Sequence, residues 1–461
     1  EAQAGGSSTS AARENLRARL DAVEARIRTI DTRLKVDAPQ YFAILNQQAV
    51  GLDDLRDVLD EDEAVLFLVP TERGTHSMVV TRETIAWERA DTDGTALTEA
   101  AIRFREGLEI KAGSQFLPVF DLDLAFELYS DLIAPVESAL AGKSRVYAVA
   151  DGALSRIPLG TLVTEAPPEG ADPDDPDVLR AAGWLADRYA LVQLPSLQSL
   201  VYIRRFGSGS AADGGNFTGF GAPVLEGEGA TRGARSATLA PVDAASLVGP
   251  LRGNAPPLME PSALRKLAAL PGTKNELENV RNALGNGSLF LGPQMTEDAI
   301  RHADLSKTAI LHLATHAFTS EEAGSLAEPG LVFTPPQTAN PDDDGYLAAS
   351  EVVGLNLAAA RWVILSACNT AAPSGKTGQT GLSGLAQAFF YAGAQSLLVS
   401  HWPVFDDVAP VITVEALKAS ESGLPRAEAL QRAQQSVRND PELDAAHPAV
   451  WAPFTLVGEG R

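Results

Sequence analysis

Apolar residues along this chain follow two patterns, short continuous runs typical of buried strands and recurrences every three or four positions typical of helices. The predicted strands are 64–69, 77–81, 144–150, 189–194, 216–221, 288–291, 308–317, a run that opens at 361, 395–402 and 453–457. The predicted helices are 11–35, 96–109, 126–140, 196–205, 273–284, 296–303, 382–392, 407–419 and 426–438. This alternation predicts an α/β protein with a doubly wound, mostly parallel sheet.

The pattern also divides the chain into parts. We expect a tail and helical region at 1–60, an α/β support unit at 61–205, a Gly/Ser-rich linker at 206–215 and a second α/β domain at 216–461. The helix at 11–35 is amphipathic, with charges of alternating sign beside its apolar stripe. We expect this helix to pack on the body of the protein; the alternative is that it continues a helical array.

Composition and charge exclude several classes of function. The formal net charge of −23 argues against direct contact with nucleic acid and against docking on anionic lipid, and it leaves basic partners compatible. A single cysteine excludes an internal disulfide and a sulfur-rich zinc site. We expect no metal and no other cofactor. No apolar run approaches the ~18 residues of a membrane span. The chain begins without an initiator methionine or a signal segment, so we expect a fragment or processed product with a cytoplasmic location.

The single cysteine, Cys368, stands where a buried apolar run opens into a polar loop, and His316 ends another such run. The two residues lie 52 positions apart (368 − 316), which leaves room for a crossover between neighbouring parallel strands. Open α/β sheets place their sites at the carboxyl ends of strands. The sequence therefore predicts that this thiol and this imidazole meet above the sheet.

A cysteine attacks as thiolate, and a free thiol with a pKa of ~8.5 needs a neighbouring base at neutral pH. His316 is the candidate base, and the backbone amides of Ala317 and Cys368 are the candidate oxyanion donors. The alternative for Cys368 is the ordinary one for a lone cysteine, a small buried hydrophobe. The matching position of His316 favours the catalytic interpretation.

Several motifs, in this order, resemble the signature of the CHAT domain family of caspase-like cysteine peptidases, which are related to separases, metacaspases and gingipains. They are 312–318 (His-Leu-Ala-Thr-His-Ala-Phe), 344–351 (Asp-Gly-Tyr-Leu-Ala-Ala-Ser-Glu), 365–370 (Leu-Ser-Ala-Cys-Asn-Thr), 381–394, 400–406 (Ser-His-Trp-Pro-Val-Phe-Asp) and 451–454 (Trp-Ala-Pro-Phe). The resemblance is strong over 290–458 and extends more weakly upstream, to a CHAT region of roughly 110–458. It implies a caspase-like fold for the second domain.

The resemblance implies that Cys368 is the nucleophile and His316 the general base or ion partner of peptide-bond hydrolysis. Ala317 departs from the glycine that often follows this histidine in caspase-like enzymes, but alanine keeps the N–H. The resemblance also assigns Trp402 and His401 to the wall of the substrate pocket. Asp406 is either a pocket residue that selects Arg or Lys, or the N-cap of the following helix.

Two further groups have an ordinary structural explanation. His312 lies four residues before His316 on the same strand face and resembles a structural histidine of the family. The acidic residues Asp342, Asp343, Asp344 and Glu351 are expected to form a solvated turn, with calcium binding as the alternative.

We therefore expect a caspase-like cysteine endopeptidase that acts on a protein or peptide substrate. An activator or an upstream helical-repeat sensor would regulate it, and the Gly- and Pro-rich tracts within 206–261 are candidate self-cleavage sites. The first α/β unit lacks cysteine, so it would be inactive and supportive. The alternatives are a non-catalytic scaffold of the same fold, acting by protein–protein contact, and a small-molecule acyl transferase that uses the same thiol.

Overall fold

The computed structural model describes residues 50–110, 116–206, 216–227, 258–318, 328–366, 384–402 and 407–461, and the single positions 17, 25, 26, 29, 32, 247, 404 and 405. The chain forms two compact units, Glu1–Gly51 and Leu52–Arg461. In the first unit the described positions are helical and exposed up to position 32, and the hydroxyl of Thr29 donates to the carbonyl of Ala25 at 2.9 Å. These positions agree with the helix predicted at 11–35. Where that helix packs stays a prediction.

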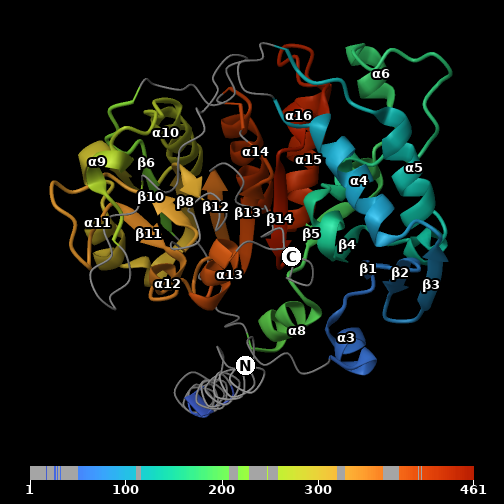
Figure 1. Ribbon diagram of the computed structural model, residues 1–461, viewed down its shortest axis with the longest axis horizontal. Coiled ribbons are helices and arrows are strands. Elements are labelled where there is room, and N and C mark those ends of the chain that lie inside the picture. The colour runs from blue at the N-terminus through green and yellow to red at the C-terminus, as the bar shows by residue number, and fades with distance from the viewer. Residues whose placement is uncertain are drawn as a thin grey trace, which may run out of the picture. The chain divides into compact units, whose positions relative to one another are not determined.

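An eleven-stranded sheet runs through the second unit, in the order β3-β2-β1-β4-β5-β14-β13-β12-β8-β6-β7. Figure 1 shows these strands side by side across the unit, with β6 and β8 toward one end and β3 at the other. The strands are β1 (Glu63–Thr71), β2 (Gly74–Val80), β3 (Ile85–Ala90), β4 (Arg145–Ala150), β5 (Ala190–Gln193), β6 (Asn216–Gly221), β7 (Ser288–Leu291), β8 (Thr308–Ala314), β12 (Trp362–Ser366), β13 (Ser396–Ser400) and β14 (Phe454–Gly458).

The sheet consists of two parallel groups that run in opposite directions. Strands β7, β6, β8, β12 and β13 are mutually parallel, as are β1, β4, β5 and β14. The direction reverses where β13 pairs with β14 in antiparallel register, and β2 pairs antiparallel with both β1 and the edge strand β3. Because β14 pairs with β5, strands from the two predicted α/β parts belong to one continuous sheet.

Helices cover both faces of this sheet. Phe220 of β6 packs in the same core cluster as Phe389 of α13, whereas a Cβ on Gly221 would stand 2.6 Å from the Leu277 side chain of α10. Successive strand residues point to opposite faces, so α13 and α10 lie on opposite sides. The predicted fold class, a doubly wound and mostly parallel α/β sheet, is confirmed.

The helical elements that surround the sheet are α3 (Leu52–Val58), α4 (Gly94–Glu106), α5 (Leu122–Leu132), η1 (Glu137–Leu140), η2 (Gly152–Arg156), η3 (Leu159–Thr161), α6 (Pro176–Ala181), α7 (Leu185–Arg188), α8 (Leu197–Phe206), α9 (Pro261–Leu264), α10 (Gly272–Leu284), η5 (Gly292–Gln294), α11 (Glu297–His302), η6 (Leu305–Lys307), α12 (Ala349–Val352), α13 (Gly384–Tyr391), α14 (Ala409–Glu421), α15 (Arg426–Asn439) and α16 (Pro448–Trp451). Among the helices that the structure describes, no segment combines the length and the apolar character needed to cross a bilayer.

A second, three-stranded antiparallel sheet is inserted between β8 and β12. Its strands are β9 (Ala317–Phe318), β10 (Gly330–Val332) and β11 (Tyr346–Ala348), in the order β11-β10-β9. It begins directly after His316, because β9 starts at the next residue. The backbone N–H of Val332 donates to the carbonyl of His316 at 2.9 Å. This small sheet therefore holds the backbone of the predicted catalytic histidine.

Candidate active site

The two strands that lead to the predicted dyad are neighbours. Strand β8 pairs with β12 in parallel, and at the carboxyl end of the pair Ala314 lies opposite Ser366. His316 follows Ala314 by two residues along the chain, and Cys368 follows Ser366 by two residues. The crossover geometry that the spacing predicts is therefore present at β8 and β12.

The His316 imidazole is buried, with 5% of the residue exposed, and its orientation is set by a backbone contact. Its Nε2 lies 2.8 Å from the carbonyl oxygen of Ala268. A carbonyl only accepts, so Nε2 carries the proton in the neutral ring, which leaves Nδ1 as the basic nitrogen. A histidine held in this tautomer can accept a proton at Nδ1.

Ala317 lies in β9, opposite Leu331 of β10, and 9% of its surface is exposed. Among the described residues, the non-glycine positions with positive φ are Ala222 and Asp444. The backbone at Ala317 is thus one that alanine adopts without strain, and the glycine of related enzymes is not required here. Its role as an oxyanion donor stays a prediction.

Cys368 and Asp406 lie outside the described residues. Strand β12 ends at Ser366 and helix α13 begins at Gly384, and residues 367–383 between them lie outside the described residues. Helix α14 begins at Ala409 with Val408 at its N-cap position, so Asp406 is not the N-cap of this helix; a pocket role for Asp406 stays a prediction.

His401 and Trp402, predicted to line the substrate pocket, are buried directly after β13. His401 Nε2 lies 2.8 Å from the Thr455 hydroxyl, and the Trp402 indole N–H donates to the Ala449 carbonyl at 2.8 Å. Burial, with a smaller contribution from the Arg105 charge, lowers the pKa of His401 to about 3. At neutral pH His401 is therefore an uncharged ring inside the protein, with its side chain committed to internal contacts.

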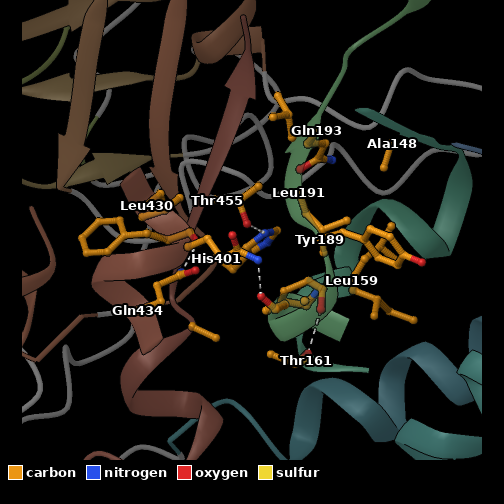
Figure 2. A pocket seen from close by; sticks show the side chains of 18 of the residues that line it. Ala148, Leu159, Thr161, Tyr189, Leu191, Gln193, His401, Leu430, Gln434 and Thr455 are labelled. Carbon is orange, nitrogen blue, oxygen red and sulfur yellow. Dashed lines mark hydrogen bonds between the residues drawn. The ribbon is translucent and has the colours of Figure 1, made fainter. Parts of the chain in front are cut away.

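A cavity of about 70 Å³ lies beside His401. It is lined by β5, by α15, by the start of β14 and by the segment from η2 to η3, and His316 is not among its lining residues. Figure 2 shows His401 between Thr455 and Gln434 on one side and the segment around Leu159 on the other. The volume suits one or two water molecules, well below that of pockets which hold a small-molecule ligand.

His312 lies inside the core on β8, fully buried. Its Nε2 is 3.0 Å from the Glu276 carboxylate of α10, which is itself 3% exposed. The contact ties α10 to the strand that leads to His316. This placement agrees with the structural role expected for His312.

The acidic segment before β11 is organised by a carboxylate that sequence reasoning missed. Oε1 of the buried Glu297 accepts the backbone N–H groups of 344–346 at 2.8, 2.6 and 3.0 Å. Arg301 pairs with Glu297 at 3.0 Å and with Glu351 at 2.6 Å. Asp342 is exposed, and no group of His, Cys, Asp or Glu within the described part of the chain is arranged to hold a metal ion.

Crowding of acids raises two pKa values in this cluster. Burial, together with the charges of Asp344 and Glu351, raises the pKa of Glu297 to about 7. Burial, with the charge of Glu351, raises the pKa of Asp344 to about 6. Both groups bind protons more tightly in the folded than in the unfolded chain, so their stabilising contribution is complete below about pH 4 and is lost as pH rises through 6 to 7.

Glu297→Gln is therefore expected to become more stable relative to the wild type as pH rises from 5 to 7.5. Glutamine keeps an acceptor for the three backbone amides and removes the cost of ionising a buried carboxyl, a difference of up to about 1 kcal/mol per pH unit. Equilibrium urea unfolding of both proteins at several pH values measures it. Asp298→Asn, at a 73% exposed side chain on the same helix, is the matched control. A pH-independent difference between wild type and Glu297→Gln would contradict the prediction.

Arg105 and Ala268 are two further residues of this region that sequence reasoning missed. Arg105 of α4 donates to the carbonyl of His401 at 2.9 Å across 296 positions of sequence. Ala268 acts through its carbonyl, which no side-chain pattern indicates. The one available signal for Arg105 was an arginine among the apolar positions of the predicted helix 96–109.

Part of this chain is similar in sequence to two tetratricopeptide repeat proteins. Tetratricopeptide repeat protein 28 of Mus musculus is 27% identical over 216 residues, which cover 41% of this chain and 8% of that protein. The protein of the same name from Homo sapiens is 26% identical over 216 residues, with the same coverage. The chain thus spans less than a tenth of the length of these curated relatives.

Among solved structures, the chain is similar to the Arg-specific cysteine proteinase gingipain R, with a TM-score of 0.37 and 10% identity over 74% of this chain and 66% of that chain. It is also similar to the Saccharomyces cerevisiae separase–securin complex, with a TM-score of 0.47 and 9% identity over 88% of this chain and 30% of that chain.

The CHAT domain family model matches residues 122–459. This range includes β8, β12 and the segment after β13, and it agrees with the region predicted from the motifs. The match extends over well more than half of the chain, so the chain belongs to the CHAT domain family.

Proposed function

We propose that this protein is a cysteine endopeptidase that uses Cys368 and His316 to hydrolyse peptide bonds of a protein substrate. The observation that carries the proposal is the parallel pairing of β8 with β12, which ends with Ala314 opposite Ser366, two residues before His316 and Cys368 respectively. Membership of the CHAT domain family, which resembles caspase-like peptidases, supports it.

In the proposed reaction, His316 Nδ1 takes the thiol proton and the Cys368 sulfur attacks the scissile carbonyl carbon. The negative charge develops on the carbonyl oxygen, where the amides of Ala317 and Cys368 would donate hydrogen bonds. His316 returns the proton to the leaving amine as the C–N bond breaks. A water molecule then hydrolyses the thioester, with His316 again as base, and the thiol is regenerated.

The contact between His316 Nε2 and Ala268 supports this assignment of roles. A ring that donates through Nε2 is oriented to work through its other nitrogen. When Nδ1 takes a proton, the Ala268 carbonyl stabilises the cationic ring with a charge-assisted hydrogen bond. The carbonyl would then do for this histidine what a carboxylate does in a serine-protease triad.

Regulation by a partner is a further part of the proposal. The relatives are named for tetratricopeptide repeats, and this chain spans 8% of their length. We therefore propose that the peptidase is controlled by a helical-repeat sensor or a separate activator. Self-cleavage within 206–261 would be a second route, and most of that range lies outside the described residues.

Incubation with denatured casein and with a mixed peptide library tests the proposal. We expect new amino termini, detected by mass spectrometry, with the wild type and not with Cys368→Ala, since the thiol is the proposed nucleophile. Cleavage that persists in Cys368→Ala would contradict the dyad.

Two other outcomes separate the alternatives. If the wild type cleaves no substrate, alone or with candidate activators added, the result would favour a non-catalytic scaffold of the same fold. Acylation of Cys368 by small thioesters without any peptide cleavage would favour an acyl transferase.

A further inference from the structure

A buried arginine from the first α/β segment reaches the segment after β13. Arg105, at the end of α4, is 7% exposed. Its Nη2 donates to the carbonyl of His401 at 2.9 Å, and its guanidinium carbon lies 5.4 Å from the centre of the Trp402 ring. The arginine thus contacts two consecutive residues of this segment by two different interactions.

The other anchors of the same two residues come from the C-terminal part of the chain. The backbone N–H of His401 donates to the carbonyl of Pro453 at 2.9 Å, and its ring contacts Thr455. The Trp402 indole donates to Ala449. Arg105 therefore adds a fixing point from the opposite side of the seam between β14 and β5.

A guanidinium in this place carries a cost that simple packing would not require. Burial lowers the pKa of Arg105, and the partner carboxylate Glu109 opposes that shift. The Glu109 side chain is 47% exposed, so the ion pair is only partly shielded from water. An apolar residue of similar size would fill the space without this desolvation. The specific gain from arginine is a charged donor to the His401 carbonyl combined with a planar group over the indole.

We propose that Arg105 is a positioning residue for the substrate-binding edge of the active site, fixing the backbone of His401 and Trp402 from the first α/β segment. The proposal rests on the proposed function and on the family resemblance, which assigns His401 and Trp402 to the wall of the substrate pocket. Both rings, and the backbone N–H and C=O of His401, are committed to internal contacts, so Arg105 acts on the substrate edge by holding the position of the segment after β13. A displacement of this backbone by even 1 Å lowers catalysis without touching the dyad.

This assignment gives the first α/β segment an indirect part in the reaction, through the position of His401 and Trp402. It carries no cysteine, and by this proposal it supplies one guanidinium that sets the edge on which the peptide lies. Any movement of α4 would be passed to His401 and Trp402 through Arg105.

The test compares two reagents that react with the same thiol. Peptidyl acyloxymethyl ketones with Arg, Lys, Asp or Leu at P1 need the substrate edge, whereas iodoacetamide needs only the nucleophile. For Arg105→Met we expect the second-order rate of peptidyl labelling at Cys368 to fall roughly 10- to 100-fold, as for loss of a charged hydrogen bond. The rate with iodoacetamide should stay within about 2-fold, since the dyad is untouched.

Matched variants separate positioning from folding. Arg103→Met, on the same helix at an exposed side chain, should label like the wild type. Arg105→Lys should give an intermediate rate, because lysine donates one hydrogen bond but lacks the planar group; this variant carries the test if Arg105→Met does not fold. Unchanged peptidyl labelling in both Arg105 variants, or an equal loss with both reagents, would overturn the positioning role.

A different labelling result would contradict the proposed function. If peptidyl labelling of the wild type does not occur, or does not depend on Cys368, the peptidase proposal falls and the Arg105 role falls with it. If wild-type labelling depends on Cys368 and the Arg105 variants match it, only the Arg105 role is overturned.

Discussion

Replacing His316 with alanine is expected to lower kcat/KM for peptide cleavage by ~10³-fold or more at neutral pH. The loss arises because the thiol would have no base to take its proton and the leaving amine no acid to protonate it. We expect the chain to stay folded, since the backbone contact between His316 and Val332 does not depend on the side chain. Initial rates on a peptide identified from the library measure the effect, with circular dichroism as the check on folding.

The pH dependence distinguishes a base from a merely structural histidine. Without His316, the residual rate should climb with pH toward the ionisation of an unassisted thiol, with a pKa of ~8.5. His302→Ala is the control, since that side chain is 76% exposed. Retention of more than about a tenth of the wild-type rate, with an unaltered pH profile, would rule out the role of His316 as base.

The sequence was sufficient to predict the strands that lead to His316 and Cys368. The apolar run at 308–317 and the run that opens at 361 predict β8 and β12, because a buried parallel strand has to be apolar on both faces. The spacing between His316 and Cys368 then predicts neighbouring strands, which the pairing confirms. The Ala268 carbonyl was not predictable, since a backbone acceptor leaves no mark on side-chain identity.

The strands and helices were predictable within each α/β part, but the pairing of β5 with β14 that joins the two parts was not. Strands β6 and β7 have the predicted bounds, and α15 ends within one residue of the prediction. Edge strand β3 was missed because it carries Glu88 and Arg89 and buries no side chain fully. The short strands β9 to β11 offer two or three residues each, too few for a period to show.

The joining of the two parts into one sheet depends on contacts that local patterns do not encode. Strand β14 pairs with β13 on one side and with β5, more than 250 residues earlier in the chain, on the other. An apolar run at 453–457 predicts a buried strand but not its partners. The polar residues that gather beside this seam likewise come from distant positions.

Beside the seam lies a buried ionic cluster centred on Arg204 of α8. Its guanidinium contacts Glu63 of β1 at 2.5 and 2.8 Å and Glu459, which follows β14, at 2.8 and 2.9 Å. It also donates to the Tyr147 hydroxyl at 2.6 Å. Arg145 pairs with the same Glu63 at 2.6 Å. The cluster therefore ties the start of β1, the end of the chain and α8 to one point.

Arg204→Met is expected to lower the free energy of unfolding by about 3–5 kcal/mol, because it leaves two buried carboxylates short of a cation. The Arg204 and Glu63 side chains are 4% and 0% exposed, so water cannot replace the lost hydrogen bonds. Equilibrium unfolding in guanidinium chloride at pH 7 measures the change. Arg205→Met is the matched control on the same helix: its surface pair with Asp54 involves side chains that are 37% and 47% exposed, and its loss should cost less than about 1 kcal/mol.

The fall in the free energy of unfolding at acid pH gives an independent check on the same cluster. Burial alone would raise the pKa of Glu63, but the hydrogen bonds and charge of Arg204 outweigh it and lower this pKa to about 2. A depressed carboxyl pKa stabilises the fold above its unfolded value, near 4.5, and this contribution is lost as pH falls toward 2. Arg204→Met should therefore lose less stability than the wild type between pH 4.5 and 2, because Glu63 no longer has a strongly depressed pKa to lose. Parallel acid-unfolding curves for the two proteins would contradict the central role of Arg204 and move the stabilisation of Glu63 to Arg145.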